Sequence, residues 1–151
     1  MKTLLILLMI SSFFLFTACN EQVILPDNDC PKYKELGYIN RDSLKTDRFL
    51  VQAVNIEGDC LRLTLQYSGG CAEHEVNLVL MIPECGTPPL PSPTFEISHD
   101  ANGDMCEAWI TKDYSFNISG IREEGKHKTD FVLNVRNAAG EWSSTTYTYN
   151  Y

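Results

Sequence analysis

The sequence is poor in positive charge, with 12 Lys and Arg against 20 Asp and Glu and a formal net charge of −8. It has no basic cluster, because its most charged stretch, residues 122–128, mixes Arg and Lys with Glu. An acidic surface repels phosphates, so the composition argues against nucleic acid as a partner. The acidic residues instead indicate a well-solvated surface.

The sequence also lacks an apolar run long enough to cross a membrane. Its longest run, residues 4–16, is broken by Ser11 and Ser12 and follows a single basic residue, Lys2. A transmembrane helix needs roughly 20 apolar residues, whereas the hydrophobic region of a secretory signal needs roughly 7–15. The N-terminus therefore predicts export rather than a membrane span.

Catalytic motifs are missing as well. The sequence has no Gly-x-Ser-x-Gly elbow, no phosphate-binding loop and no His-Glu-x-x-His pair. Glu73 and His74 are adjacent, but neighbouring residues of a strand point to opposite faces and cannot work together as acid and base. We therefore expect a protein that is not an enzyme.

The hydrophobic region ends in Phe16-Thr17-Ala18-Cys19, which resembles the bacterial lipobox, although Phe16 stands where Leu is usual. The resemblance implies cleavage before Cys19 and acylation of Cys19, with palmitate among chains that anchor the protein firmly to a membrane. Asn20, where a retention signal would resemble Asp, favours the outer membrane by the same resemblance. We expect a signal peptide at 1–18, a lipidated cysteine and tether at 19–45, and a folded domain at 46–151.

Hydrophobic residues of the folded domain recur with a period of two, the pattern of half-buried strands. Leu61, Leu63 and Leu65 share one face, and residues 76–82 are apolar on both faces, which is typical of a central strand. About seven such segments, with no helical period outside the signal, predict an all-β fold. We expect an antiparallel two-sheet sandwich, immunoglobulin-like in the broad sense, with a small β-barrel as the alternative.

Five cysteines remain in the mature chain, a number that suits an oxidising compartment but leaves one thiol over. Two of them belong to the segments 69–74 and 99–108, which flank the third and fourth expected strands. If these strands are neighbours, the start of one lies beside the end of the other. Four side chains then meet at one end of the sandwich: Cys71, His74, His99 and Cys106.

Three interpretations of this cluster compete. The favoured one is a disulfide between Cys71 and Cys106, with the two histidines as hydrogen-bonded residues at the rim. The second is a zinc site with Cys71, Cys106, His74 and His99 as ligands, which oxidation of the thiols opposes. The third is a calcium loop formed by Asp100, Asn102 and Asp104. This spacing resembles the start of an EF-hand but has Met105 and Thr111 where Gly and Glu are needed.

The other cysteines allow two pairings. Cys60 and Cys85 come together if their strands form a hairpin, which leaves Cys30 as the free thiol. Alternatively, Cys30 bonds Cys60 and staples the tether to the sandwich. The sequence leaves both pairings open.

The strings G-G-C-x-x-H and H-D-x-x-G-D-x-C-E-A resemble those of short exported bacterial proteins and lipoproteins of uncharacterised function. This resemblance covers residues 59–135. A more distant resemblance is to the NigD-like β-sandwich lipoproteins of the Bacteroidota. Neither resemblance implies an activity, and together they imply only that Cys71 and Cys106 act as a unit.

Two functions fit these observations best: a binding or adhesion module of the cell envelope, for a glycan or a protein, and a structural accessory lipoprotein of a surface complex. A metal-binding envelope protein, with zinc or calcium, comes third. The candidate binding surface is aromatic, although packing in the core or at an edge is the commoner role of such residues. It consists of Trp109, Trp142, Tyr147 and Tyr149.

Overall fold

The computed structural model describes residues 30–83, 91–136 and 140–151. The expected signal peptide, Cys19 and Cys85 lie outside the described residues. No helix within the described part of the chain is long and apolar enough to span a membrane.

Eight strands and two short 3-10 helices make up the described chain. In chain order they are β1 (Lys34–Gly37), η1 (Tyr38–Ser43), β2 (Leu50–Glu57), β3 (Cys60–Gly69), β4 (Glu75–Ile82), β5 (Thr94–Asp100), β6 (Ala108–Asn117), η2 (Ser119–Ile121), β7 (Lys128–Arg136) and β8 (Trp142–Asn150).

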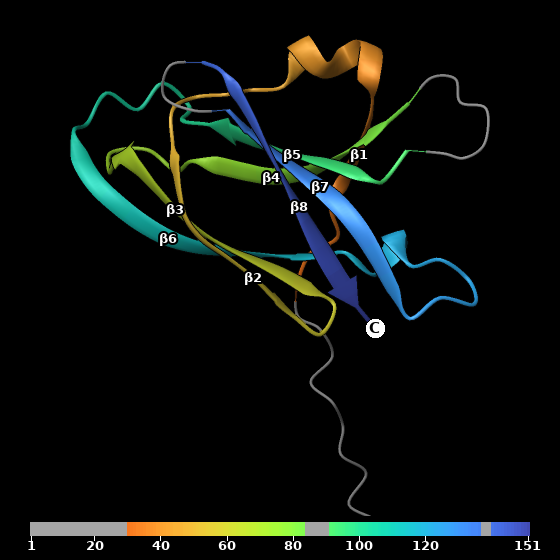
Figure 1. Ribbon diagram of the computed structural model, residues 1–151. Coiled ribbons are helices and arrows are strands. Elements are labelled where there is room, and N and C mark those ends of the chain that lie inside the picture. Colours follow the sequence, from red (N-terminus) through yellow and green to blue (C-terminus); the bar gives the residue numbers. More distant parts are fainter. Residues whose placement is uncertain (1–29, 84–90, 137–139) are drawn as a thin grey trace, which may run out of the picture.

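The strands form two sheets that pack face to face (Figure 1). One sheet has five strands in the order β1-β4-β5-β7-β8, and the other has three in the order β2-β3-β6. This confirms the expected all-β sandwich, and the sheets do not close into the alternative barrel. The larger sheet is mixed rather than purely antiparallel, because β1 pairs with β4 and β5 pairs with β7 in parallel. The parallel pair β5–β7 arises because the chain leaves to form β6 in the other sheet before it returns.

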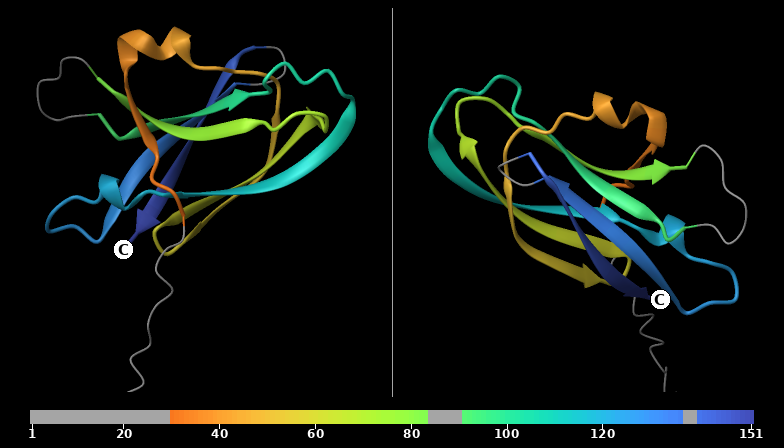
Figure 2. Two further views of the ribbon diagram at one scale, coloured as in Figure 1. Left: turned by 180° about the vertical axis from the view of Figure 1, so that it is seen from behind. Right: turned by 45° about the horizontal axis from the view of Figure 1, so that its top comes forward.

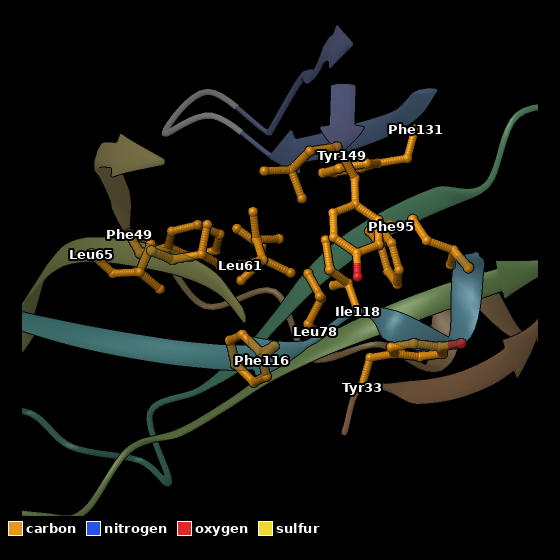
Figure 3. Packing of buried hydrophobic residues seen from close by; sticks show 14 of the residues in the cluster. Tyr33, Phe49, Leu61, Leu65, Leu78, Phe95, Phe116, Ile118, Phe131 and Tyr149 are labelled. Atoms are coloured by element: carbon orange, nitrogen blue, oxygen red, sulfur yellow. The ribbon is translucent and has the colours of Figure 1, made fainter. Parts of the chain in front are cut away.

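The core lies between the sheets and is built from the alternating residues of each strand (Figure 3). Leu61, Leu63 and Leu65 of β3 are fully buried, as the period of two predicts. They face Phe95 of β5 and Phe131 of β7, which are also fully buried. Each such side chain stabilises the fold by roughly 1.5–3 kcal/mol relative to its exposed state.

Strand β4 is buried on both faces, as the apolar residues on both of its faces predict. Leu78 faces the core, while Val79 and Met81 point to the opposite side and are only 3% and 4% exposed. Figures 1 and 2 show η1 on that opposite side, over the face of the five-stranded sheet that points away from the three-stranded one.

The N-terminal segment belongs to the sandwich, so the expected domain boundary at residue 46 is too late. The strand β1 lies alongside β4, with Lys34 opposite Val79. Arg41 of η1 contacts Glu96 of β5, whose side chain is fully buried, with 2.6 Å between Arg41 Nη2 and Glu96 Oε1. A strand of four residues and a 3-10 turn are too short to show a hydrophobic period, which is why this segment is read from sequence as a tether.

Candidate functional site

The two cysteines and two histidines that were expected to meet do so at one end of the sandwich. β4 pairs antiparallel with β5, and this register places Val76 opposite His99. The expected disulfide between Cys71 and Cys106 is present, with 5.8 Å between the two Cα atoms. We use the name rim cluster for Cys71, His74, His99, Asp104 and Cys106.

Asp104 holds the two loops of the rim cluster together. Its Oδ2 accepts hydrogen bonds from the backbone N–H groups of Gly70, Cys71 and Ala72, at 2.8–2.9 Å. Its Oδ1 accepts a further bond from the N–H of Cys106 at 2.8 Å. These donors favour the carboxylate form, so the backbone bond from Cys106, followed by those from the 70–72 loop, holds the pKa of Asp104 well below its ordinary value.

The two histidines form a hydrogen-bonded chain that ends on Asp104. His99 Nδ1 lies 3.0 Å from the carbonyl oxygen of Asp47 and must donate to it, because a carbonyl oxygen only accepts. His99 Nε2 is then the acceptor for His74 Nδ1, at 2.8 Å. His74 Nε2 lies 3.3 Å from Asp104 Oδ2, which is also an acceptor. The two imidazole rings and the Asp104 carboxylate therefore form one continuous chain of polar contacts.

This chain is closed to solvent. The side chains of His74 and Asp104 are 2% and 0% exposed, and His99 is 1% exposed as a residue. Tyr67 stacks on the His74 ring at 4.6 Å between centroids, and Phe49 meets the His99 ring edge-on at 5.6 Å. Burial lowers the pKa of His99; the hydrogen bond to the Asp47 carbonyl opposes this effect, and the neighbouring His74 ring adds to it.

Gly69, the first glycine of the G-G-C-x-x-H string, lies against the histidine of the same string. A Cβ atom at this position would lie 2.5 Å from His74 Nε2 and 3.0 Å from Asp104 Oδ2. The backbone of β3 can therefore lie against His74 and Asp104 only where no side chain intervenes. The sequence does not indicate this contact between the glycine and the histidine.

The rim cluster does not fit a metal ion. The Sγ atoms of Cys71 and Cys106, which with an oxygen of Asp104 lie within 4.8 Å of one another, are joined in the disulfide. The ring nitrogens of His74 and His99 are already in hydrogen bonds. The zinc interpretation therefore loses all four ligands.

Several polar atoms that the calcium interpretation would use are engaged within the loop. Asp100 Oδ1 accepts the N–H of Asn102, and Asn102 Nδ2 donates to the carbonyl oxygen of Glu73 at 2.6 Å. Both oxygens of Asp104 are taken by backbone donors. Asn102 has a φ of 51°, so the three residues close a tight loop rather than surround a cation. The geometry favours the first interpretation, a disulfide with satisfied histidines.

The second disulfide joins Cys30 to Cys60, with 6.1 Å between Cα atoms, so the pairing of Cys60 with Cys85 is wrong. Strand β6 explains this pairing, because it lies between β3 and the segment that follows Cys30. Asn117 of β6 is opposite Cys60 in the sheet and also forms a bridge with Lys32. The N-terminal segment therefore runs close to the start of β3.

The four aromatic residues of the expected binding surface do not form one surface. Trp109 of β6 is 69% exposed on the outer face of the three-stranded sheet. Trp142 of β8 lies on the outer face of the other sheet, with the guanidinium of Arg41 4.1 Å from its ring centroid. Tyr149 is fully buried and donates a hydrogen bond to Asp59, and Tyr147 is half-buried against Phe131. The expected aromatic surface is therefore wrong.

A groove of about 400 Å³ opens instead between β2 and the pair β7–β8. It exists because the smaller sheet covers only part of the larger one, and because β2 and β8 are terminal strands that each pair on one side. The inner face of β8 contributes Ser143, Thr145 and Tyr147, and β7 contributes Val135. β2 contributes residues 50–54, of which Val51 is half-buried. Sequence analysis misses this groove, since it depends on the strand order.

A family model described as the NigD-like C-terminal beta sandwich domain matches residues 32–150. This chain belongs to the NigD-like family. The family match covers both sheets and begins before β1, in agreement with the early start of the domain. It also supports the NigD-like resemblance seen in the sequence. No curated protein matches the chain.

Three solved structures share this fold. A putative toxin-related protein from Parabacteroides distasonis is 23% identical, with a TM-score of 0.62, over 80% of this chain and 59% of its own. A protein of unknown function from Bacteroides vulgatus is 19% identical, with a TM-score of 0.56, over 81% and 57%. A NigD-like immunity protein from Bacteroides caccae is 15% identical, with a TM-score of 0.57, over 80% and 64%. The NigD-like chain described here thus spans about three fifths of the length of these structures.

Proposed function

We propose that this protein is a lipid-anchored binding protein of the bacterial outer membrane, and that an extended segment of another protein binds in the groove between β2 and β8. The groove is the observation that carries the proposal. It combines a concave surface of about 400 Å³ with two strands whose outer edges have no partner strand in the described chain. That combination is used by proteins that bind extended peptides by adding a strand to a sheet.

The anchor is supported by the resemblance of residues 16–19 to a lipobox. Ten residues lie between Cys19 and Cys30, which the disulfide fixes to Cys60 at the start of β3. The rim cluster lies at the far end of β3, a strand of ten residues and therefore about 33 Å long. In this arrangement the Cys30–Cys60 end is nearer the membrane, and the groove runs along the side of the domain.

A protein ligand is favoured over a glycan by the chemistry of the groove. Glycan sites stack sugars on exposed aromatic rings, but the exposed tryptophans of this chain lie on opposite faces. The groove is lined mainly by hydroxyl and aliphatic side chains, among them Ser143, Thr145 and Val135, and its two aromatic rings are those of Phe49, which is buried, and Tyr147, which is half-buried. Such a lining accepts alternate side chains of a strand whose backbone bonds to the sheet edge. The Bacteroides caccae structure is named an immunity protein, which is a second reason to search for a protein ligand.

The test uses neighbouring positions of β8 that point to opposite faces. A photo-crosslinking residue at position 145 in the full-length protein, in cells, should capture a partner in the groove, and the purified partner should then bind the wild-type protein. Thr145→Trp fills the groove and should weaken this binding at least tenfold. Thr146→Trp, on the outer face of the same strand, is the matched control and should leave the affinity unchanged.

Two results would contradict the proposal. Equal loss of affinity in both variants would mean that β8 acts through its outer face. A stable envelope complex that survives Thr145→Trp would favour a structural accessory role. The anchor has its own test: labelled palmitate should enter the wild-type protein and not the Cys19→Ser variant.

A further inference from the structure

The two disulfides of this chain differ in how far solvent can reach them. Cys30 and Cys60 are buried, at 8% and 6% exposed. In the rim disulfide, by contrast, Cys71 is exposed and Cys106 is half-buried. Thiol–disulfide exchange requires an attacking thiolate to reach one of the two sulfur atoms. A dithiol in solution can therefore attack the rim disulfide at Cys71, whereas the other disulfide is covered.

The rim cysteines are held together by more than their disulfide. The carboxylate of Asp104 accepts the backbone N–H of Cys71 at 2.9 Å and that of Cys106 at 2.8 Å. The three-stranded sheet has the same effect, because it pairs Gly69 with Ala108, and each of these lies two residues from one of the cysteines. When the disulfide opens, both thiols therefore remain on backbone that is fixed in place.

Reduction would turn this disulfide into two metal ligands that lie beside a third. One oxygen of Asp104 and the two Sγ atoms lie within 4.8 Å of one another, and they are the one such group of His, Cys, Asp and Glu side chains in the described residues. Two sulfur ligands of a tetrahedral zinc ion, each about 2.3 Å from the metal, are about 3.8 Å apart. A small rotation of the two cysteine side chains is enough to admit the ion.

Asp104 keeps acceptor capacity for a metal. A carboxylate has about four positions for hydrogen bonds or ligands. Oδ2 accepts the three N–H groups of residues 70–72, but Oδ1 accepts only that of Cys106 among the described residues. His74 Nε2 lies 3.3 Å from Oδ2, where it can fix the orientation of the carboxylate, as outer partners do in metal sites. Oδ1 can therefore bind a metal while the backbone bonds of Asp104 remain.

We propose that the rim disulfide is a redox-controlled zinc site: a dithiol reductant opens it, and the two thiolates then bind one zinc ion together with Asp104. One thiolate of the reductant attacks Cys71 Sγ, and Cys106 leaves as a thiolate. The second thiolate of the reductant then displaces Cys71. The reductant becomes a disulfide, and its two electrons remain on the cysteine sulfurs. Zinc takes the place of the protons that the two thiolates would otherwise bind.

Charge and ligand type favour zinc as the ion. Two thiolates beside a carboxylate repel one another, and a dication offsets this repulsion. Two sulfur ligands and one oxygen suit zinc, whereas calcium and magnesium prefer oxygen ligands alone. The exposed side of Cys71 leaves the fourth position of the ion to water. The oxidised protein has no such site, because its two sulfur atoms are bonded to each other.

The redox step is tested on full-length protein in detergent, equilibrated without oxygen in buffers of reduced and oxidised dithiothreitol. Free thiols are labelled with a maleimide and located by mass spectrometry. Cys71 and Cys106 should be labelled in buffers that leave Cys30 and Cys60 bonded. Near-ultraviolet circular dichroism should show that this partly reduced protein is folded. Simultaneous reduction of both disulfides, or unfolding when the rim disulfide opens, would overturn the proposal.

The metal step uses the same partly reduced protein after dithiothreitol is removed. It should bind one Zn²⁺ per chain in competition with a chromogenic chelator, and Co²⁺ should give the thiolate-to-metal absorption of a four-coordinate site. Cys71→Ala with Cys106→Ala should lose the site. The matched control, Cys30→Ala with Cys60→Ala, should bind zinc as the wild type does. Asp104→Asn should weaken zinc binding roughly tenfold or more.

Equal zinc binding by oxidised and reduced wild-type protein would identify ordinary surface carboxylates as the ligands and overturn the site. Cobalt bound without thiolate absorption would do the same, as would an affinity that Asp104→Asn leaves unchanged. The inference does not rest on the proposed function, because the rim cluster and the groove share no residue. Failure of the zinc site would therefore leave the binding groove standing.

Discussion

Removing the disulfide of the rim cluster should cost the domain a large part of its stability. Cys71 and Cys106 are 35 residues apart in the sequence. In the chain-entropy model a cross-link of that span lowers the entropy of the unfolded chain, which stabilises the folded state by about 3.8 kcal/mol at 25 °C. Single domains are stable by about 5–15 kcal/mol, so Cys71→Ala with Cys106→Ala should lower the melting temperature by roughly 10–20 °C. The loops should still meet in the folded state, because Asp104 binds the backbone of both.

Urea unfolding followed by tryptophan fluorescence measures this loss directly. The matched control is Cys30→Ala with Cys60→Ala, whose separation of 30 residues predicts a similar loss of about 3.6 kcal/mol. A loss below about 1 kcal/mol for the rim pair, beside a full loss for the control, would refute the argument from chain entropy. A free thiol at Cys71 in the non-reduced protein would refute the disulfide itself.

Three further changes test the packing around the site. Gly69→Ala should cost about 1–3 kcal/mol in urea unfolding, because its Cβ would overlap the His74 ring. Arg41→Ala should cost about 3–5 kcal/mol by the same assay, because it leaves the buried carboxylate of Glu96 without its cation. Asp104→Asn should make the free energy of unfolding less dependent on pH under acidic conditions. The folded-state pKa of Asp104 lies below its ordinary value of 3.8, so its contribution is present above that pH and is lost as the pH falls through the lowered pKa, which urea midpoints between pH 2 and 5 would follow.

Each of these changes has a control in the same chain. Gly37→Ala should be nearly neutral, because its Cβ would meet only Asn40 Nδ2 at 3.8 Å. Lys34→Ala breaks an exposed ion pair with Glu75 and should leave the free energy of unfolding almost unchanged. Equal effects at Gly69 and Gly37, or at Arg41 and Lys34, would contradict the packing described here. An unchanged pH dependence in Asp104→Asn would contradict the role of its backbone bonds.

The rim cluster could be predicted from sequence because two local patterns determine it. The period of two sets which face His74 and His99 occupy, and the connection between β4 and β5 makes these strands antiparallel neighbours. The sequence could not show that Asp104 accepts four backbone hydrogen bonds, because backbone donors have no signature in the residue types. Its Asp-x-Asn-x-Asp spacing therefore resembles a calcium loop equally well.

The rest of the fold depends on contacts between distant segments. Cys30 pairs with Cys60 because Asn117 brings the two segments together, and nothing near either cysteine indicates this. The burial of Tyr149 is equally hidden, because β8 alternates hydroxyl and aromatic residues without an apolar face. The groove forms because a sheet of five strands faces a sheet of three. The number of strands in each sheet cannot be inferred from any single segment of the sequence.

Hydrogen exchange of the full-length protein in detergent, with and without the partner captured from position 145, tests the proposed binding site most directly. The account predicts slower exchange of backbone amides in residues 50–54 and 143–147, which line the groove, and no change in the 101–106 loop. Protection confined to that loop or to the strand of Trp109, with the groove amides unchanged, would contradict it.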